Sequence, residues 1–258
     1  EINGLVFQLD ERARETTGEG MILTASAAYT ADSGLHGWGQ LQRQDYTRSE
    51  FDDMQFRLGA GLSKDGSNGE WFIGPLVGWR EYGNAAYSRE IGLRGTGRRQ
   101  LSANWWLELG GEWTYQHNFQ NPSRSGPRTW LNLRATHNLD ARSALSFGVD
   151  LLREGSDDPQ IAATTHGVNA GYYIDWRYGI SVGMTASHQR SSYDDRQSIF
   201  DQRRTDRRDS LSLRLANRYW HLGGFMPVLS ISRILNHSDI PFFGYQRTVF
   251  QVLGERRF

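Results

Sequence analysis

The sequence has 258 residues, of which 38% are hydrophobic and 12% aromatic, and its 29 basic and 29 acidic residues give a net charge of zero. Balanced charge argues against a nucleic-acid partner, the absence of cysteine excludes disulfides and thiolate metal sites, and no apolar run reaches the roughly 18 residues of a membrane-spanning helix. A transmembrane β-barrel is compatible with these numbers, because strands that alternate between lipid and lumen conceal their hydrophobicity from hydropathy averages.

Apolar and polar residues alternate with a period of two along most of the chain, which predicts strands rather than helices. The clearest case is residues 105–115, where Trp105, Leu107 and Leu109 share one face. Pro75 falls inside an expected strand, and because proline cannot donate a ladder hydrogen bond it requires a bulge or a locally unpaired position. The expected strands, about fourteen in number, lie in chain order at about residues 4–12, 23–30, 35–47, 55–63, 71–79, 87–100, 105–115, 131–136, 145–151, 167–174, 180–187, 210–219, 229–232 and 245–258.

The connections between these strands alternate in length. Short turns follow the even-numbered strands, and longer polar segments follow several odd ones, at residues 14–20, 118–127, 155–160 and 194–209. Outer-membrane barrels have short periplasmic turns and longer external loops, so both termini are expected in the periplasm. The charged run from Arg196 to Arg208 is interpreted as an external loop that faces solvent or lipopolysaccharide, or that contacts a secreted partner.

The competing interpretation is a soluble all-β sandwich or propeller, which also alternates. Such a fold would have to place most of the nine Trp and eleven Tyr in one core. Here the aromatic residues gather near strand ends on the apolar face, as in the girdles of membrane barrels. A closed barrel also removes the open edges of a sheet. The sequence therefore predicts one transmembrane antiparallel β-barrel of the outer membrane over residues 1–258.

The polar face of the expected strands carries charges of both signs. They either solvate and stiffen the wall through Arg–carboxylate pairs or line a conduit, and their mixed signs do not favour an ion-selective porin. The candidate lumen-lining residues are Arg57, Arg80, Glu90, Arg94, Glu108, Glu112, Arg134, Asp150, Arg214 and Arg218. Trp106 and Tyr173 share this face and would suit sugar stacking in a polysaccharide export porin.

Signals of catalysis are weak. The seven His residues show no metal-ligand spacing, no Ser–His–acid arrangement stands out, and no glycine-rich loop joins a strand to a helix. His137, His166 and His188 share the parity of the apolar residues, so they are interpreted as girdle residues. We expect no enzyme activity, no metal and no cofactor.

The C-terminal strand combines apolar parity with a closing aromatic residue. Phe250, Val252 and Phe258 fall on one face, and a final Phe is typical of outer-membrane barrels, whose assembly machinery reads it. The stretch from Arg233 to Phe250, which contains Asn236-His-Ser238, Phe242-Phe243 and Tyr245-Gln-Arg247, resembles the end of the surface lipoprotein assembly modifier family (Slam). Residues 71–102, with Gly74-Pro75 and Ile91-Gly-Leu93, are similar to an internal part of the same barrel.

The resemblance implies a fourteen-stranded outer-membrane barrel of the type XI secretion family, preceded by a periplasmic helical-repeat domain that we expect to lie outside this chain. It implies export or surface display of a lipoprotein or a haem- or metal-acquisition protein. Further expected partners are outer-membrane lipid, lipopolysaccharide and the barrel assembly machinery, and the barrel is expected to be a monomer. An exopolysaccharide export porin or a passive diffusion porin is the alternative.

Overall fold

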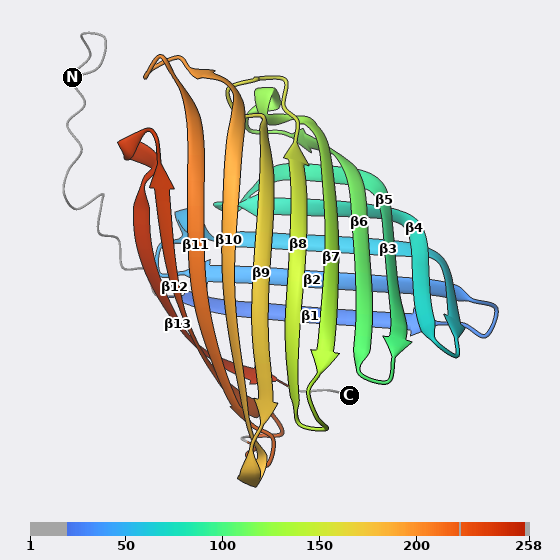
Figure 1. Cartoon of the computed structure of the whole chain (residues 1–258). Helices are drawn as coiled ribbons and strands as arrows, with labels where there is room; N and C mark the ends of the chain where they lie inside the picture. Colours follow the sequence, from blue (N-terminus) through green and yellow to red (C-terminus); the bar gives the residue numbers. More distant parts are fainter. Residues whose placement is uncertain (1–19, 222, 256–258) are drawn as a thin grey trace.

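The computed structural model describes residues 20–221 and 223–255, in which the strands form one antiparallel sheet in sequence order (Figure 1). The strands are β1 (Gly20–Thr30), β2 (Leu35–Tyr46), β3 (Asp53–Gly66), β4 (Gly69–Tyr82), β5 (Ala85–Ser102), β6 (Trp105–Asn118), β7 (Gly126–Asn138), β8 (Ser143–Glu154), β9 (Ala163–Asp175), β10 (Ile180–Gln197), β11 (Gln202–Asn217), β12 (Met226–Ser238) and β13 (Tyr245–Glu255). A single sheet rules out the sandwich interpretation for this part of the chain.

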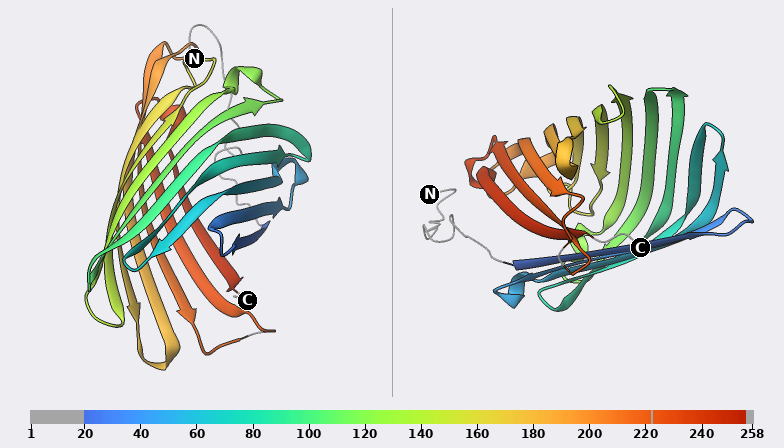
Figure 2. Two further views of the ribbon diagram at one scale, coloured as in Figure 1. Left: turned by 90° about the vertical axis from the view of Figure 1, so that its right-hand side faces the viewer. Right: turned by 90° about the horizontal axis from the view of Figure 1, so that it is seen from below.

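The strands β1 to β13 correspond one to one with the second to fourteenth strands expected from the sequence. The first expected strand, residues 4–12, lies outside the described residues. Within the described part, the sheet ends at β1 on one side and β13 on the other. The sheet twists and curls strongly, so that β1 to β4 lie on the opposite side of the curled sheet from the later strands (Figure 2).

The two ends of the sheet differ in their connections. One end, called the turn end, carries the β1–β2, β3–β4, β5–β6, β7–β8, β9–β10 and β11–β12 connections. The other, called the loop end, carries the remaining connections and three 3₁₀ turns: η2 (Ser49–Phe51), η3 (Pro122–Arg124) and η5 (Pro241–Phe243). A fourth, η4 (Arg177–Gly179), lies at the turn end. No described helix is both long and apolar enough to cross a membrane.

The two faces of the sheet have opposite character, as the period of two requires. Large apolar side chains lie on the convex face and are exposed, because no second layer packs against them in the described residues. Buried apolar side chains are few, and they include Leu76 and Val228 on the concave face. The exposed set on the convex face includes Leu58, Ile73, Val77, Leu93, Leu109, Trp113, Leu131, Phe147, Val149, Val168, Leu211, Leu229, Phe250 and Val252.

Pro75 lies at an interruption of the sheet, as the sequence predicts. The β3–β4 ladder pairs Gly59 with Leu76 and resumes at Leu62 with Ile73, so the two intervening pairs are missing. The proline nitrogen has no hydrogen to donate toward β3. The pairing of β4 with β5 continues without a break at Pro75.

The structure corrects the interpretation of residues 194–209 as a loop. β10 extends to Gln197 and β11 begins at Gln202, so the connection is only four residues long, 198–201. The charged residues flanking it belong to a long hairpin. The reason is that these parts of β10 and β11 lack the apolar alternation on which the strand prediction depended, although their backbones still pair.

Candidate functional site

The concave face is the candidate functional surface, because side chains from distant strands converge on it. Arg57 of β3 lies opposite Gly78 of β4, which in turn lies opposite Glu90 of β5. Since Gly78 has no side chain, Arg57 reaches across β4 and its Nε donates to the Glu90 carboxylate at 2.6 Å. A Cβ added at Gly78 would lie 2.5 Å from that carboxylate. A side chain at this position would therefore have to displace the Glu90 carboxylate from its present place.

The Arg57 guanidinium also binds a second carboxylate, that of Glu112 on β6, through Nη2. The side chains of Arg57, Glu90 and Glu112 are only 16%, 9% and 10% exposed. On β5, Arg94 lies opposite Glu112 and places its guanidinium 4.9 Å from the ring centre of Trp38 on β2. These five residues, Trp38, Arg57, Glu90, Arg94 and Glu112, form a polar belt that crosses β2 to β6 on the concave face.

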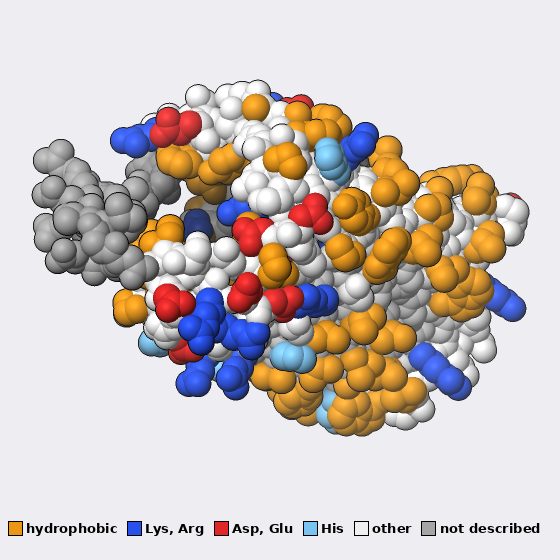
Figure 3. Space-filling model, turned by 90° about the horizontal axis from the view of Figure 1, so that it is seen from above, with side chains coloured by type: hydrophobic (Ala, Val, Ile, Leu, Met, Phe, Trp, Pro, Cys, Tyr) orange, Lys and Arg blue, Asp and Glu red, His pale blue; other side chains and the backbone are white. Residues whose placement is uncertain are grey.

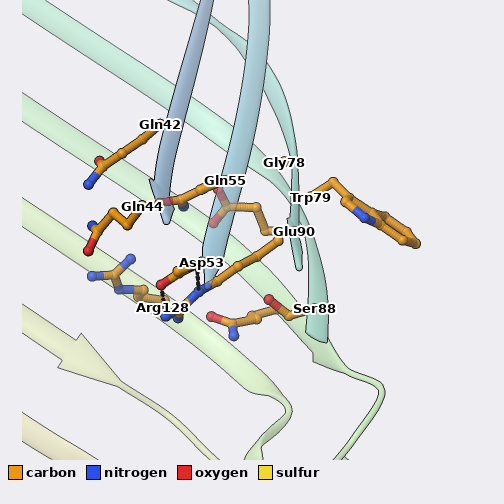
Figure 4. A pocket seen from close by; sticks show the side chains of 11 residues that line it. Gln42, Gln44, Asp53, Gln55, Gly78, Trp79, Ser88, Glu90 and Arg128 are labelled. Atoms are coloured by element: carbon orange, nitrogen blue, oxygen red, sulfur yellow. Dashed lines mark hydrogen bonds and ion pairs between the residues drawn. The ribbon is translucent and has the colours of Figure 1, made fainter. Parts of the chain in front are cut away.

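On the loop-end side of the polar belt lies a cavity of about 260 Å³ (Figure 4). Arg80 and Asp53 pair in its wall, with N–O distances of 2.9 and 2.6 Å. Trp79 points away from the cavity toward the convex face in Figure 4. Most of the remaining lining is uncharged and polar, since it includes Gln42, Gln44, Gln55, Ser88 and Gln116. Glutamine amides both donate and accept hydrogen bonds, which matches the needs of an extended polypeptide backbone.

On the other side of the polar belt, toward the turn end, lies a larger cavity of about 680 Å³. Trp38 and Arg94 of the belt line it, together with Phe72 and Trp130. An ion pair in this region joins Arg98 to Glu108 at 3.3 Å, and the two side chains are 47% and 37% exposed. The polar belt therefore stands between two open volumes of the concave face.

The sequence-predicted residues divide into those that the structure brings together and those that it keeps apart. Arg57, Glu90, Arg94 and Glu112 meet in the polar belt, while Arg80 and Glu108 pair with Asp53 and Arg98. The other candidates do not take part in the polar belt. By register Arg134, Asp150 and Arg214 share the concave face on β7, β8 and β11, and Arg218 follows β11 and lies 3.5 Å from Asp175.

Several functional candidates were not identified from the sequence. Trp38 lies in β2, where glycines at 37 and 39 occupy the convex face. Because these positions carry no apolar side chain, the alternation that marks the two faces of a strand is lost there. The alternation Gln40-Leu-Gln42-Arg-Gln44 could have revealed the glutamine-rich wall, since its amides recur with the strand period.

The aromatic residues proposed for sugar stacking are engaged with protein groups. The Arg98 guanidinium lies 4.4 Å from the ring centre of Trp106, and the Tyr173 hydroxyl donates to Asp175 at 2.6 Å. The geometry therefore gives no specific support to a polysaccharide path.

The convex face carries the predicted C-terminal and histidine residues. Phe250 and Val252 are 75% and 80% exposed there, and Phe258 lies outside the described residues. His137, His166 and His188 pair in register with apolar-face positions. Among the described residues no group of three or more His, Cys, Asp or Glu side chains is arranged to hold a metal ion.

Comparison with known proteins matches residues 39–258 to the family model described as "Surface lipoprotein assembly modifier". A curated relative, "Surface lipoprotein assembly modifier 1" of Haemophilus influenzae, is 23% identical over 210 residues, which cover 78% of this chain and 44% of the relative. The chain thus spans less than half the length of that relative. The match confirms the resemblance found in the C-terminal motifs and agrees with a role other than that of an enzyme. Because the family model covers most of its length, this chain belongs to the surface lipoprotein assembly modifier family.

Proposed function

We propose that this chain is the membrane-spanning part of an outer-membrane translocon that exports a client protein and displays it on the cell surface. The observation that carries the proposal is the division of one curled sheet into an uncovered apolar convex face and a charge-paired polar concave face. In water such an apolar face would be a severe aggregation liability. In a bilayer it is the face that meets lipid.

The proposal includes closure of the sheet into a barrel of fourteen strands. Residues 4–12, with Leu5, Phe7 and Leu9 at alternate positions, would supply the strand between β13 and β1. Open edges are not tolerated in hydrocarbon, because their backbone groups would lack partners. With this strand both termini fall at the turn end, in the periplasm, and the loop end faces outward. Phe250, Val252 and Phe258 would then present the assembly signal on the lipid-facing side.

The polar belt and the glutamine-rich cavity mark the client's path in this proposal. The belt holds two cations, Arg57 and Arg94, and two carboxylates, those of Glu90 and Glu112. The wall therefore offers hydrogen bonds without a strong field of one sign. A partly unfolded chain with charges of both signs can pass such a wall without being trapped on it. The client class is a surface lipoprotein or a secreted haem- or metal-acquisition protein, and no cofactor takes part.

Single-cysteine cross-linking in cells tests the path, since the chain has no cysteine of its own. The variants Gln42→Cys and Gln55→Cys place a thiol in the glutamine-rich cavity, and Leu58→Cys and Leu133→Cys place one on the convex face as matched controls. A candidate lipoprotein carrying one cysteine should form a disulfide with the first pair only. Equal cross-linking of both pairs would refute the path.

Deletion of the gene that encodes the complete protein tests the function as a whole. Loss of one lipoprotein or secreted protein from the surface is the expected result. Unchanged surface display together with altered polysaccharide export, or with altered small-solute uptake, would replace the translocon by a polymer porin or a diffusion porin.

A further inference from the structure

Two arginine and two histidine side chains, all exposed, form a row across neighbouring strands near the loop end. His166 of β9 lies opposite Arg190 of β10, Arg190 lies opposite Arg207 of β11, and Arg207 lies opposite His237 of β12. All four side chains are exposed. They share the convex face with Val168 and Leu211, which lie two and four residues away from the row along β9 and β11. We call this set the Arg–His row.

The two arginines lie directly opposite each other on neighbouring strands. Within the described part of the chain, neither Arg190 nor Arg207 makes a side-chain hydrogen bond or an ion pair. Like charges directly opposite each other destabilise a pair of strands. Two neighbouring contacts on the same face do join opposite charges or a histidine and a carboxylate, since His188 contacts Asp209 at 2.7 Å and Arg153 binds Asp194. An anion from outside the chain would relieve the repulsion between the two arginines.

The row lies at the margin of the apolar band. Arg190 is ten residues beyond Ile180, the first residue of β10, so the two lie roughly 34 Å apart along the strand at about 3.4 Å per residue. A strand tilt of about 40° reduces this to a height of about 26 Å, close to the roughly 25 Å of the apolar band in outer-membrane barrels. Seen from above in Figure 3, Lys and Arg side chains gather at one side of the molecule beside several Asp and Glu side chains, with His and hydrophobic side chains close by. The Arg–His row therefore lies at the level at which lipid head groups begin.

We propose that the Arg–His row binds the phosphate groups of the phosphorylated glycolipid of the outer leaflet, lipopolysaccharide. This inference rests on the proposed function, because the convex face must meet lipid and the loop end must face outward. Arg190 and Arg207 supply charge-assisted, bidentate donors to phosphate oxygens. His166 and His237 extend the row with one further donor on each side. The leaflet is fixed by the loop-end position, since a periplasmic-leaflet phospholipid would meet the opposite margin.

The test uses the double variant Arg190→Gln/Arg207→Gln of the 258-residue chain, purified and refolded with lipid. The matched control is Arg99→Gln/Arg177→Gln, which removes the same charge at the turn end. Native mass spectrometry measures retention of four probes: lipopolysaccharide, its dephosphorylated form, phosphatidylglycerol and inorganic phosphate. Wild type and control should retain lipopolysaccharide roughly tenfold or more better than the double variant. Dephosphorylation should remove that difference.

Equal retention by wild type and double variant would overturn the proposal, as would undiminished retention of the dephosphorylated glycolipid. Phosphatidylglycerol or free phosphate bound as tightly as lipopolysaccharide would overturn the assignment to the outer-leaflet glycolipid. Insertion of each protein into vesicles is followed in the same samples by protection from protease. Failure of the wild-type chain to insert would count against the proposed membrane-spanning function, whereas insertion without glycolipid preference counts against the Arg–His row alone.

Discussion

Replacing Arg57 with glutamine should destabilise the sheet strongly, because its guanidinium binds two carboxylates that are almost fully buried. The Glu90 and Glu112 side chains are 9% and 10% exposed. The substitution removes the hydrogen-bonded partner of both carboxylates and leaves Glu112 with Arg94 opposite it. Removing one partner of a buried pair costs roughly 3–5 kcal/mol, and because the Arg57 side chain itself retains 16% exposure we expect about 3 kcal/mol.

The matched control is Arg98→Gln on the same face. Its pair with Glu108 is 47% and 37% exposed, so water can solvate the remaining carboxylate and the cost should stay below about 1 kcal/mol. Adding Glu90→Gln and Glu112→Gln to Arg57→Gln removes the two carboxylate charges, and stability should return to within roughly 1 kcal/mol of wild type.

The measurement is urea unfolding of the chain refolded into lipid vesicles, followed by tryptophan fluorescence and by the gel shift between folded and unfolded forms. The free energy of unfolding is compared for wild type, both single variants and the triple variant. The reasoning is refuted if Arg57→Gln costs no more than Arg98→Gln, or if the triple variant is less stable than Arg57→Gln alone.

Three further outcomes follow from the described contacts. Gly61→Ala should cost about 1–3 kcal/mol, since its Cβ would lie 2.2 Å from a backbone oxygen of β4, and a melting temperature equal to wild type would show that the strands can separate freely there. Leu133→Arg on the convex face should cost about 2–4 kcal/mol in vesicles and Asn132→Arg on the concave face much less; the reverse order would reject the lipid-facing assignment. At the β7–β8 turn, the pKa of the Asp140 carboxyl lies below its usual range, chiefly because it accepts a hydrogen bond from the Arg142 backbone N–H. The stability that wild type has over Asp140→Ala should therefore be fully present above about pH 4, the usual value, and should fall as the pH drops through the lower native pKa. A difference in stability that grew as the pH was lowered from about 4 would contradict this.

The sequence was sufficient to predict strands wherever apolar residues mark one face. β6 is the best example, because Trp105, Leu107 and Leu109 define its parity without reference to any other strand. The same signal failed for the facing ends of β10 and β11, where charged residues occupy both faces. Those ends pair through their backbones, and backbone pairing leaves no trace in residue type.

The polar belt was predicted only in its membership. Parity placed Arg57, Glu90 and Glu112 on one face. Along the chain, however, Glu90 and Glu112 lie 33 and 55 residues after Arg57. Their contact depends on the register of four strands and on Gly78, whose missing side chain opens the way across β4. Register is set by many weak pairs at once. A single sequence therefore gives the face of a residue more readily than its partner.

The interrupted ladder at Pro75 has a consequence for how the sheet opens. Amide hydrogens in an intact sheet exchange with solvent mainly from its frayed margins inward, since interior strands are held on both sides. Here the missing pairs between Gly59–Leu76 and Leu62–Ile73 lie in the middle of two long strands. Deuterium should therefore enter the β3–β4 seam early, at the N–H groups of residues 60–61 and 74 that point across the gap, while the β2–β3 and β4–β5 ladders beside it remain protected. Such exchange would mark a point of low local stability in the interior of the wall, beside the fully buried Leu76.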